Sequence, residues 1–463
     1  MMNRIKGFIR VSSWLLLAIS SCPLLAQRTT LPADTPAARL SDDSLMTLVE
    51  YQTFQYFWNG AEPTSGLAQE RIHQDGVYPL HDQNVVTTGG SGFGMMTLLV
   101  GIERGFITRD EGRARLQQMV TFLEKADRFH GAWPHWLDGE TGKVKPFSSN
   151  DDGGDLVETA FLVQGLLSVR QYFVQGTPEE QALAEQIDRL WKGVEWDWYT
   201  KGGENVLYWH WSPNHAWAMN FPVGGYNECL VMYVLAAASP THPIDPAVYH
   251  QGWARGGAIR SDSTYYGYAL ELDHYEHDDA PVGPLFWAHY SYLGLDPRHL
   301  TDRYANYWTL NRHHALAHLA YAIENPNNYV GYGEDSWGLT SSYSVNGYAG
   351  HRPGHDLGVI SPTAALSSIP YTPEASLKAM RHFYTDLGQY IWGEYGFYDA
   401  FSETQGYYPP RYLAIDQGPI VVMIENYRSG LLWKLFMSCP EVQQGLRKLN
   451  FETDTPDTEE VRN

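Results

Sequence analysis

Four carboxylates fall within eight positions of the sequence, directly before an apolar run. Asp151, Asp152, Asp155 and Glu158 all belong to the segment 148–167, SSNDDGGDLVETAFLVQGLL. Its two glycines allow a sharp turn into a helix, on which Asp155 and Glu158 would lie one turn apart on the same face. One or two acids in a first helical turn are ordinary, because free N–H groups and the helix dipole favour negative charge there. Four acids together indicate a functional site at the mouth of a helical core.

Three other stretches combine acids with glycine just before or inside apolar segments. They are NFPVGGYNE (220–228), which ends in Glu228, GEDSWG (333–338), and AIDQGP (414–419), which contains Asp416. A glutamate on a helix that continues Cys-Leu-Val-Met would be partly buried, and a buried charge needs a reason. Asp416 has an alternative explanation as an N-cap residue before Pro419.

Pairs of carboxyl groups in a cleft are suited to cleaving glycosidic bonds. One group must be protonated to assist the leaving oxygen, and the other must be ionised to activate water or attack carbon. Burial and neighbouring carboxylates can separate two such pKa values. The acidic stretches found here therefore offer candidates for both roles.

Aromatic residues support a carbohydrate-binding interpretation. The chain has 16 Trp and 31 Tyr, and many lie in Gly- and Pro-rich connections. Flat amphipathic rings fit the apolar face and hydroxyl edge of a sugar, although any single ring could simply pack a loop onto the core. As a set they favour a carbohydrate cleft. The residues of this set are Trp133, Trp136, Trp196, Trp198, Tyr208, Trp209, Trp211 and Trp217.

The sequence predicts neither a metal site nor a cofactor. It has no HExxH, Walker, dinucleotide-binding or GxSxG motif, and the segment 148–159 lacks the EF-hand pattern. His314 and His318 are four residues apart, and His274 and His277 lie near Asp278 and Asp279. Histidines at such spacings in Tyr-rich segments are more often hydrogen-bonded core or cleft residues than metal ligands.

The N-terminal residues 1–26 are typical of an export signal. Arg4, Lys6 and Arg10 precede a short apolar stretch, 14–19, that is too short to span a bilayer. ISSC at 19–22 resembles a lipobox, which would place a lipid on Cys22, whereas LLA at 24–26 could be a signal peptidase I site. We therefore expect a periplasmic protein or an outer-membrane lipoprotein, with no transmembrane span elsewhere.

Charge and cysteine content limit the partners and the covalent structure. The formal charge of −21 disfavours nucleic acid and anionic lipid and favours a neutral or cationic ligand. Besides Cys22 there are only Cys229 and Cys439, which could pair but do not form a disulfide framework. We expect a monomer.

Helical periodicity dominates the rest of the chain, and no βαβ rhythm or hairpin ladder is present. Short turns alternate with long Gly/Trp/Tyr-rich loops in one domain, 41–450, between a leader (27–40) and a polar tail (451–463). We predict an all-α (α/α)6 toroid of six helical hairpins, with the long loops forming a cleft at one end; a curved helical solenoid is the alternative. The expected helices cover 42–58, 95–104, 109–126, 156–173, 178–195, 225–238, 246–253, 284–293, 302–323, 363–368, 374–390 and 419–435.

Four motifs resemble one known family. DDGGDLVETAF (151–161), NFPVGGYNE (220–228), EDSWGLT (334–340), and AIDQGP (414–419) with ENY (425–427) are similar to bacterial glucoamylase-like proteins of glycoside hydrolase family 144, the β-1,2-glucanases. The resemblance extends over about residues 40–450. It implies an (α/α)6 barrel and anomer-inverting hydrolysis of β-1,2-glucosidic bonds without a cofactor, either endo-acting or exo-acting with release of sophorose.

The resemblance also assigns expected roles to individual residues. Glu228 is expected to be the general acid and Asp416 the general base, while Asp151, Asp155 and Glu158 hold sugar hydroxyls and water. The aromatic residues predicted to bind substrate are Trp136, Trp217, Tyr226 and Trp337. Two rivals remain: a non-catalytic glycan-binding lipoprotein, and a glycosidase or lyase of different linkage specificity on the same toroid.

Overall fold

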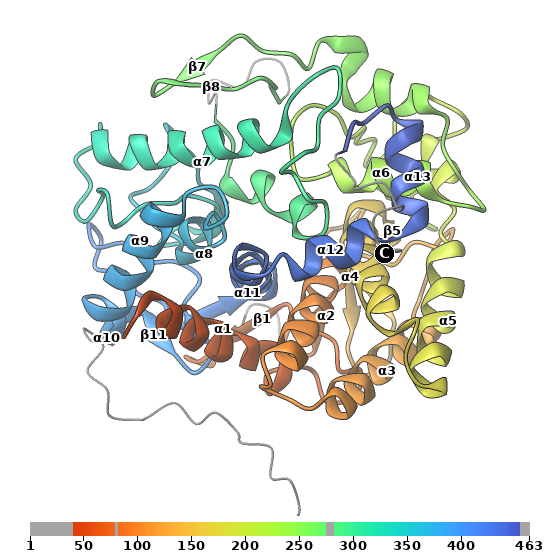
Figure 1. Ribbon diagram of the computed structural model, residues 1–463, viewed down its shortest axis with the longest axis horizontal. Coiled ribbons are helices and arrows are strands. Elements are labelled where there is room, and N and C mark those ends of the chain that lie inside the picture. Colours follow the sequence, from red (N-terminus) through yellow and green to blue (C-terminus); the bar gives the residue numbers. More distant parts are fainter. Residues whose placement is uncertain (1–39, 79–81, 275–281, 454–463) are drawn as a thin grey trace, which may run out of the picture.

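The computed structural model describes residues 40–78, 82–274 and 282–453. The predicted signal, Cys22, His277, Asp278, Asp279 and nearly all of the predicted leader and tail lie outside these residues. Within the described chain, helices are arranged around α11, which lies near the middle of Figure 1. The predicted all-α toroid is confirmed, and strands occur only as short pieces without a closed sheet.

Thirteen α-helices are present in the described residues. Their bounds are α1 (Asp42–Trp58), α2 (Thr88–Glu103), α3 (Arg109–Lys125), α4 (Leu156–Phe173), α5 (Pro178–Lys192), α6 (Leu230–Ala238), α7 (Tyr307–Glu324), α8 (Pro362–Leu366), α9 (Pro373–Thr385), α10 (Gly388–Ile391), α11 (Ala414–Arg428), α12 (Leu431–Met437) and α13 (Pro440–Lys448). A π-helix covers Val248–Trp253, and 3-10 turns cover Trp196–Thr200, Arg255–Gly257, Leu285–Ala288 and Tyr290–Leu293.

The inner helices are buried on nearly every side, which explains their apolar and glycine-rich sequences. All nine residues of α6 are buried, as are most of α2, α4 and α11. Glycine allows α2 and α4 to approach closely: a Cβ at Gly92 would lie 2.3 Å from Phe161 O, and one at Gly165 would lie 2.2 Å from Gly92 O. The outer helices α3 and α5 bury one face and begin with the predicted capping boxes at Thr108/Glu111 and Thr177/Glu180.

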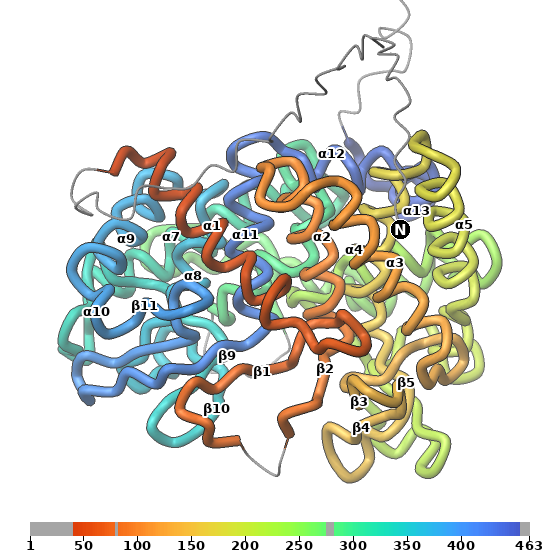
Figure 2. Tube along the Cα trace, turned by 90° about the horizontal axis from the view of Figure 1, so that it is seen from below, coloured from red at the N-terminus to blue at the C-terminus, as the bar shows by residue number. Residues whose placement is uncertain are grey.

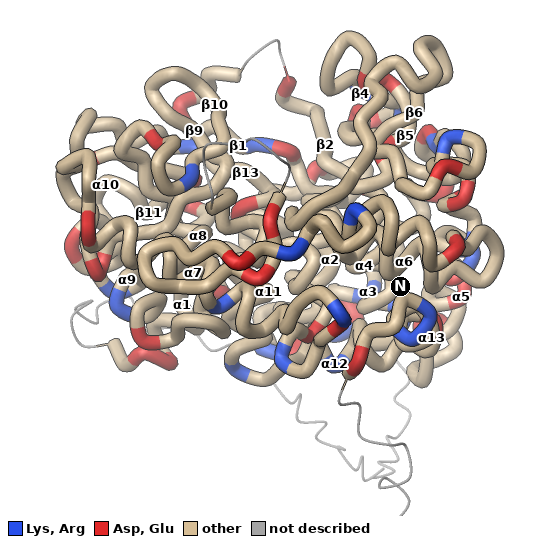
Figure 3. Tube along the Cα trace, turned by 90° about the horizontal axis from the view of Figure 1, so that it is seen from above, with Lys and Arg blue, Asp and Glu red and all other residues tan. Residues whose placement is uncertain are grey.

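Many of the short strands gather at one end of the ring. Figure 2 shows β1–β5, β9 and β10 at the end opposite α12 and α13, and Figure 3 shows acidic positions beside β4, β5 and β6. All described strand pairs are antiparallel, with orders β1-β13, β2-β3-β4, β5-β6, β7-β8, β9-β10 and β11-β12. The bounds are β1 (Arg71–His73), β2 (Val85–Thr87), β3 (Trp136–Asp138), β4 (Val144–Lys145), β5 (Gly154–Asp155), β6 (His210–Trp211), β7 (Thr264–Tyr265), β8 (Tyr268–Ala269), β9 (Ser341–Ser344), β10 (Gly347–Gly350), β11 (Trp392–Gly393), β12 (Gly396–Phe397) and β13 (Arg411–Leu413).

Several predicted helix boundaries were wrong, and two of them affect the candidate acids. The predicted helix 225–238 begins only at Leu230, so Glu228 precedes the helix. The predicted helix 419–435 begins at Ala414 and ends at Arg428, with α12 following; Leu413 is the N-cap residue, so the N-cap interpretation of Asp416 is also wrong. The helix α2 begins at Thr88, not at 95, and 284–293 forms two 3-10 turns.

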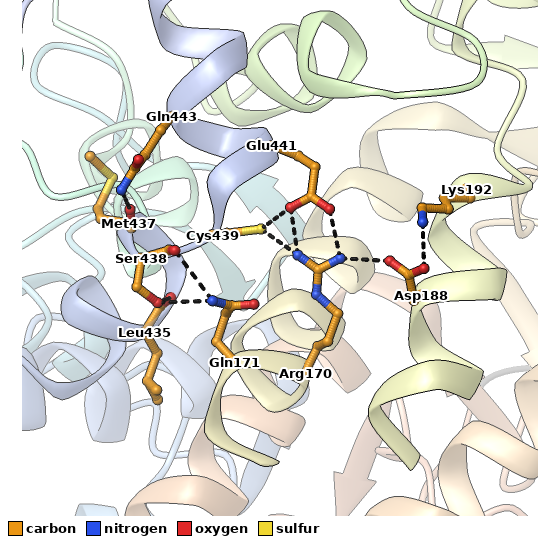
Figure 4. Close-up of polar contacts among 10 residues, drawn as sticks. All are labelled: Arg170, Gln171, Asp188, Lys192, Leu435, Met437, Ser438, Cys439, Glu441 and Gln443. Carbon is orange, nitrogen blue, oxygen red and sulfur yellow. Dashed lines mark hydrogen bonds and ion pairs between the residues drawn. The ribbon is translucent and has the colours of Figure 1, made fainter. Parts of the chain in front are cut away.

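A polar cluster far from the strand end fastens the C-terminal helices to the ring (Figure 4). Arg170 on α4 donates to Asp188 Oδ1 at 2.7 Å and to Glu441 Oε2 at 2.7 Å. The Cys439 thiol lies in the same cluster, 2.7 Å from Arg170 Nη2. Both Cys439 and Cys229 are buried and free, so the open possibility of their pairing is not realised.

No helix within the described ranges is both long and apolar enough to span a bilayer.

Candidate active site

Four acids, Asp151, Asp152, Asp155 and Glu158, form an acidic wall at the strand end, and Asp155 makes the most contacts within it. Asp155 is the N-cap residue of α4, and its Oδ1 accepts the backbone N–H of Glu158 at 2.9 Å. Its Oδ2 accepts the indole N–H of Trp209 at 2.8 Å and lies 2.9 Å from His135 Nδ1. The pairing of β5 with β6 brings the Trp209 loop to this position. Asp155 is therefore completely buried but fully hydrogen-bonded.

Glu158 forms the next part of the wall. Its Oε2 accepts the backbone N–H of Gly89 at 2.8 Å, one of the free donors in the first turn of α2. Burial raises the pKa of Glu158 to about 7, although the nearby charge of His135 lowers it. His135 Nε2 lies 4.0 Å from Glu158 Oε1. Although burial lowers the pKa of His135, the charges of Glu158 and Asp155 raise it to about 9, so this imidazole is a cation in the wall at neutral pH.

Asp151 and Asp152 have different surroundings. Asp151 is buried, and its Oδ1 lies 3.1 Å from His210 Nε2. Asp152 accepts hydrogen bonds from Ser212 and Asn214 and fixes the loop after β6. The sequence predicted no metal site, but His135, Asp151 and Asp155 could each offer one ligand atom, all within 4.8 Å of one another.

Glu228 lies just before α6 and lines a pocket of about 140 Å³. Ser291 holds this segment, because its hydroxyl donates to Glu228 O and accepts the N–H of Val231. Burial raises the pKa of Glu228 to about 7, and the charges of Glu158 and Asp155 add to the increase. A substantial fraction of Glu228 is therefore protonated at neutral pH. The pocket is lined by Trp209, Phe221, Pro222, Val223, Gly224, Asn227, Glu228, His274 and Trp287.

Asp416 lies in the first turn of α11 and is 2% exposed; it is not among the residues that line the Glu228 pocket. The Thr363 hydroxyl donates to its backbone carbonyl at 2.7 Å. Burial raises the pKa of Asp416 well above its usual value, and a second buried carboxyl, Asp399, hydrogen-bonds to it and adds to the increase. Burial raises the pKa of Asp399 to about 6.

Tyr290 is influenced by carboxyl groups from three of the predicted acidic motifs. Burial raises the pKa of its hydroxyl, and so do the charges of Asp416, Glu158 and Glu228. Its ring packs against Phe93, Phe161 and Phe286. Tyr290 therefore lies within electrostatic range of both predicted catalytic acids, Glu228 and Asp416.

Two of the aromatic residues predicted to bind substrate, Trp136 and Trp217, differ in their distance from the predicted acids. Trp136 is half-buried beside the wall, with its ring against Phe147 and Arg71. Trp217 packs among Trp198, Tyr199 and Tyr208 and does not line the Glu228 pocket.

Sugar contact by Trp337 and Tyr226 is not supported. Trp337 is completely buried. Tyr226 is 3% exposed, and its hydroxyl is held by Asn311 and His314. Both rings are part of the hydrophobic core.

Among the remaining candidates, Glu334 is 69% exposed and pairs with Lys378 at the surface. His314 and His318 both contact the carbonyl oxygen of Gly283 through Nε2, at 2.7 and 2.8 Å, which confirms that they are hydrogen-bonded core residues. The sequence interpretation did not identify His135, Tyr290, Trp287 and Asp399 as site residues. None belongs to an acidic motif, and only the long-range loop contacts bring them to the site.

Comparisons with known proteins show which proteins this chain is similar to. The Glycoamylase family model, which describes glucoamylase-type proteins, matches residues 220–440. An exo-β-1,2-glucooligosaccharide sophorohydrolase (non-reducing end) from Parabacteroides distasonis is 46% identical over 431 residues, 89% of this chain and 58% of the relative. The chain thus spans little more than half the length of that relative.

Solved structures match the full length of the domain. The endo-β-1,2-glucanase from Chitinophaga pinensis, in complex with sophorotriose and glucose, is 67% identical with a TM-score of 0.88, over 89% of this chain and 99% of that one. An endo-β-1,2-glucanase from Talaromyces funiculosus is only 11% identical, with a TM-score of 0.61 over 89% of this chain and 94% of that one, and shares the fold alone.

Proposed function

Because the chain belongs to the glucoamylase-like β-1,2-glucanases of glycoside hydrolase family 144, we propose that it hydrolyses β-1,2-glucosidic bonds in β-1,2-glucan and its oligosaccharides. One observation supports this most strongly: Glu228, whose burial raises its pKa to about 7, lines a pocket, and a separate buried carboxyl, Asp416, lies within electrostatic range of the same tyrosine, Tyr290, as Glu228 does. These are the two groups that glycosidic cleavage requires. The 67% identity to an endo-acting enzyme over 99% of its length favours endo cleavage.

Glu228 is the general acid in this proposal. Its proton passes to the glycosidic oxygen as the bond to the anomeric carbon breaks, so that the leaving sugar departs as a neutral alcohol. A pKa of about 7 leaves enough protonated Glu228 at neutral pH for this step. The negative wall of Asp155 and Glu158 helps to maintain that protonation.

Asp416 is the general base on the other side of the bond. It accepts a proton from the water that attacks the anomeric carbon from the face opposite the leaving group, which inverts the anomeric configuration. The product gains one hydroxyl from water, Glu228 loses one proton, and the base side gains one. Exchange with solvent then restores both groups.

The pocket beside Glu228 binds a sugar ring on the leaving-group side. Trp209, Phe221 and Trp287 supply its aromatic surfaces. Asp155 fixes Trp209 through the indole N–H, and the imidazolium of His135 offers a donor to sugar hydroxyls.

We also propose that the protein is exported and works as a monomer, anchored by a lipid at Cys22 or released into the periplasm. The apolar stretch 14–19 after Arg4, Lys6 and Arg10 supports this proposal. Fractionation of cells that express the wild type and Cys22→Ser tests the anchor. A lipoprotein moves from the membrane fraction to the soluble fraction in the variant, whereas an identical distribution contradicts lipidation.

Incubating the mature protein with linear β-1,2-glucan tests the activity. An endo-acting enzyme first releases a mixture of oligosaccharides, whereas exo action releases sophorose alone. A folded protein that forms no product from any β-glucan would instead be a glycan-binding lipoprotein. Turnover restricted to another polymer in a substrate panel would identify a different linkage specificity.

A further inference from the structure

Asp399 and Asp416 place two buried carboxyl groups in direct contact. Asp399 is 2% exposed and follows β12, and Asp416 is 2% exposed on α11. Their side chains hydrogen-bond to each other. Two carboxylates cannot donate to one another, so this contact requires one proton between them.

The backbone holds the two groups at this distance. The N–H of Asp399 donates to Arg411 O at 2.9 Å, and Arg411 begins β13, which runs directly into α11. The Gln417 amide donates to Tyr395 O at 2.8 Å and ties the first turn of α11 to the same segment. The contact is therefore built into the strand-to-helix connection.

Each oxygen of the pair has a distinct environment. Asp399 Oδ2 accepts the backbone N–H of Tyr343 at 2.8 Å. Asp399 Oδ1 and Asp416 Oδ2 are buried and accept a hydrogen bond from no donor among the described residues. These are the two oxygens available to share a proton, and Asp416 Oδ1 is then the oxygen of the pair that is left to accept a proton from water.

Within the described residues, no cation is among the groups that shift the pKa of Asp399 or Asp416. The titratable side chains that respond to the pair are Tyr290, Tyr343, Tyr348 and Tyr407, all uncharged at neutral pH. Arg71 and Arg411 act on Tyr343, and Arg411 also acts on Tyr407. Two adjacent anions without a cation are costly in a buried site, so the pair retains one proton over the working pH range.

We propose that Asp399 and Asp416 act as one proton-sharing dyad, in which Asp399 is the positioning residue that completes the general base. When Asp416 Oδ1 accepts the proton of the attacking water, the proton on Asp416 Oδ2 moves to Asp399 Oδ1. The water loses one proton, the singly charged dyad gains one and becomes neutral, and Asp416 ends with the same number of protons. This inference rests on the proposed hydrolysis only for the identity of the water that is deprotonated.

Asp399→Asn removes the proton acceptor while preserving the shape of the side chain. The amide oxygen can still accept the Tyr343 N–H, which turns the amide NH2 towards Asp416 Oδ2. We expect kcat to fall at least ~10-fold with KM within about twofold, because part of the usual 10²–10⁴-fold effect of a general base is lost. The acidic limb of the kcat profile should move up by about one pH unit, since an amide N–H stabilises the Asp416 anion less than a carboxylic O–H does.

Asp356→Asn is the matched control. The Asp356 carboxyl accepts hydrogen bonds from Tyr332 at 2.6 Å and Tyr321 at 3.0 Å and contacts no site residue described above. Its kcat and pH profile should equal those of the wild type. A wild-type kcat and an unshifted acidic limb in Asp399→Asn would overturn the dyad.

Infrared spectroscopy tests the shared proton without relying on activity. At a pH well above 7, where Glu158 and Glu228 are ionised, the wild-type-minus-variant spectrum should contain the band of one protonated carboxylic acid for both Asp399→Asn and Asp416→Asn. Its absence in both difference spectra would refute the dyad. If Asp399→Asn does not fold, Asp416→Asn alone gives the answer. A wild type that hydrolyses no glucan would refute the proposed function, and the infrared result would still decide the dyad.

Discussion

Replacing Gly89 by alanine should displace Glu158, because Gly89 on α2 contacts the carboxylate of this residue of the acidic wall. The Gly89 N–H donates to Glu158 Oε2 at 2.8 Å, and a Cβ at this position would lie 2.5 Å from that oxygen and 3.0 Å from Phe161 Cδ2. The carboxylate must therefore withdraw from α2. A hydrogen bond to a charged group contributes about 1.5–3 kcal/mol, so its loss should raise the pKa of Glu158 by about one to two units.

The consequence should be catalytic rather than structural. Burial already raises the pKa of Glu158 to about 7, so in the variant Glu158 stays neutral through the neutral range. His135 then loses the charge that most favours its protonation, and the pKa of Glu228 falls because a neighbouring anion has gone. We expect kcat/KM to fall about 10–100-fold, which is the loss of 1.5–3 kcal/mol, and the basic limb of the profile to move to lower pH.

The assay is the pH dependence of glucan hydrolysis together with the unfolding temperature. Alanine is favoured over glycine in a helix by up to about 1 kcal/mol, which offsets part of the clash, so the unfolding temperature should change little. Gly388→Ala is the control, since its Cβ would meet only atoms 3.8 Å away or farther. A folded Gly89→Ala variant with wild-type kcat/KM and basic limb would refute the assignment of the wall to catalysis.

Three further predictions follow from named contacts. Glu228→Gln should increase the free energy of unfolding above pH 7 by about 3 kcal/mol while removing activity. Because burial raises the folded-state pKa of Glu228 from 4.5 to about 7, the wild type loses stability as pH rises between these values, and denaturant titrations that show no gain would contradict this. Arg170→Met should lower the free energy of unfolding by about 2–4 kcal/mol in the same titrations, since Asp188 and Glu441 lose their shared partner. Its kcat at low temperature should stay unchanged, and a stability equal to that of the wild type would show that the contacts of Arg170 with Asp188 and Glu441 are unimportant. Trp209→Phe should raise KM about 10-fold, because the pocket loses ring area and Asp155 loses a donor at 2.8 Å, whereas an unchanged KM would place the sugar elsewhere.

The sequence predicted the local features of the fold most accurately. The helix α4 has the predicted bounds, because Asp155 caps it and an apolar run defines its length. The two capping boxes also formed as expected. The starts of α2 and α11 were predicted too late, since buried glycines and Pro419 are tolerated where neighbouring helices pack closely.

The sequence revealed less of the site, because long-range contacts assemble it. The acids Asp155, Glu158, Glu228 and Asp416 could be selected from their motifs. Tyr290 lies in a 3-10 turn without periodicity. Asp399 sits in a Tyr-rich segment and gains its importance only when β13 brings Arg411 and α11 beside it. Trp337 belongs to the motif EDSWGLT, and its complete burial shows that an aromatic residue beside acids in the sequence can be a core residue.

The central claim is that Glu228 and Asp416 together hydrolyse a β-1,2-glucosidic bond with inversion. Proton NMR of the anomeric signals during digestion of linear β-1,2-glucan tests it directly, with the wild type, Glu228→Gln and Asp416→Asn followed side by side. The wild type should release oligosaccharides whose new reducing ends appear first as the α-anomer, and each variant should be slower by about 10²-fold or more. A first product in the β-anomeric form, or a folded Glu228→Gln variant as fast as the wild type, would contradict the claim.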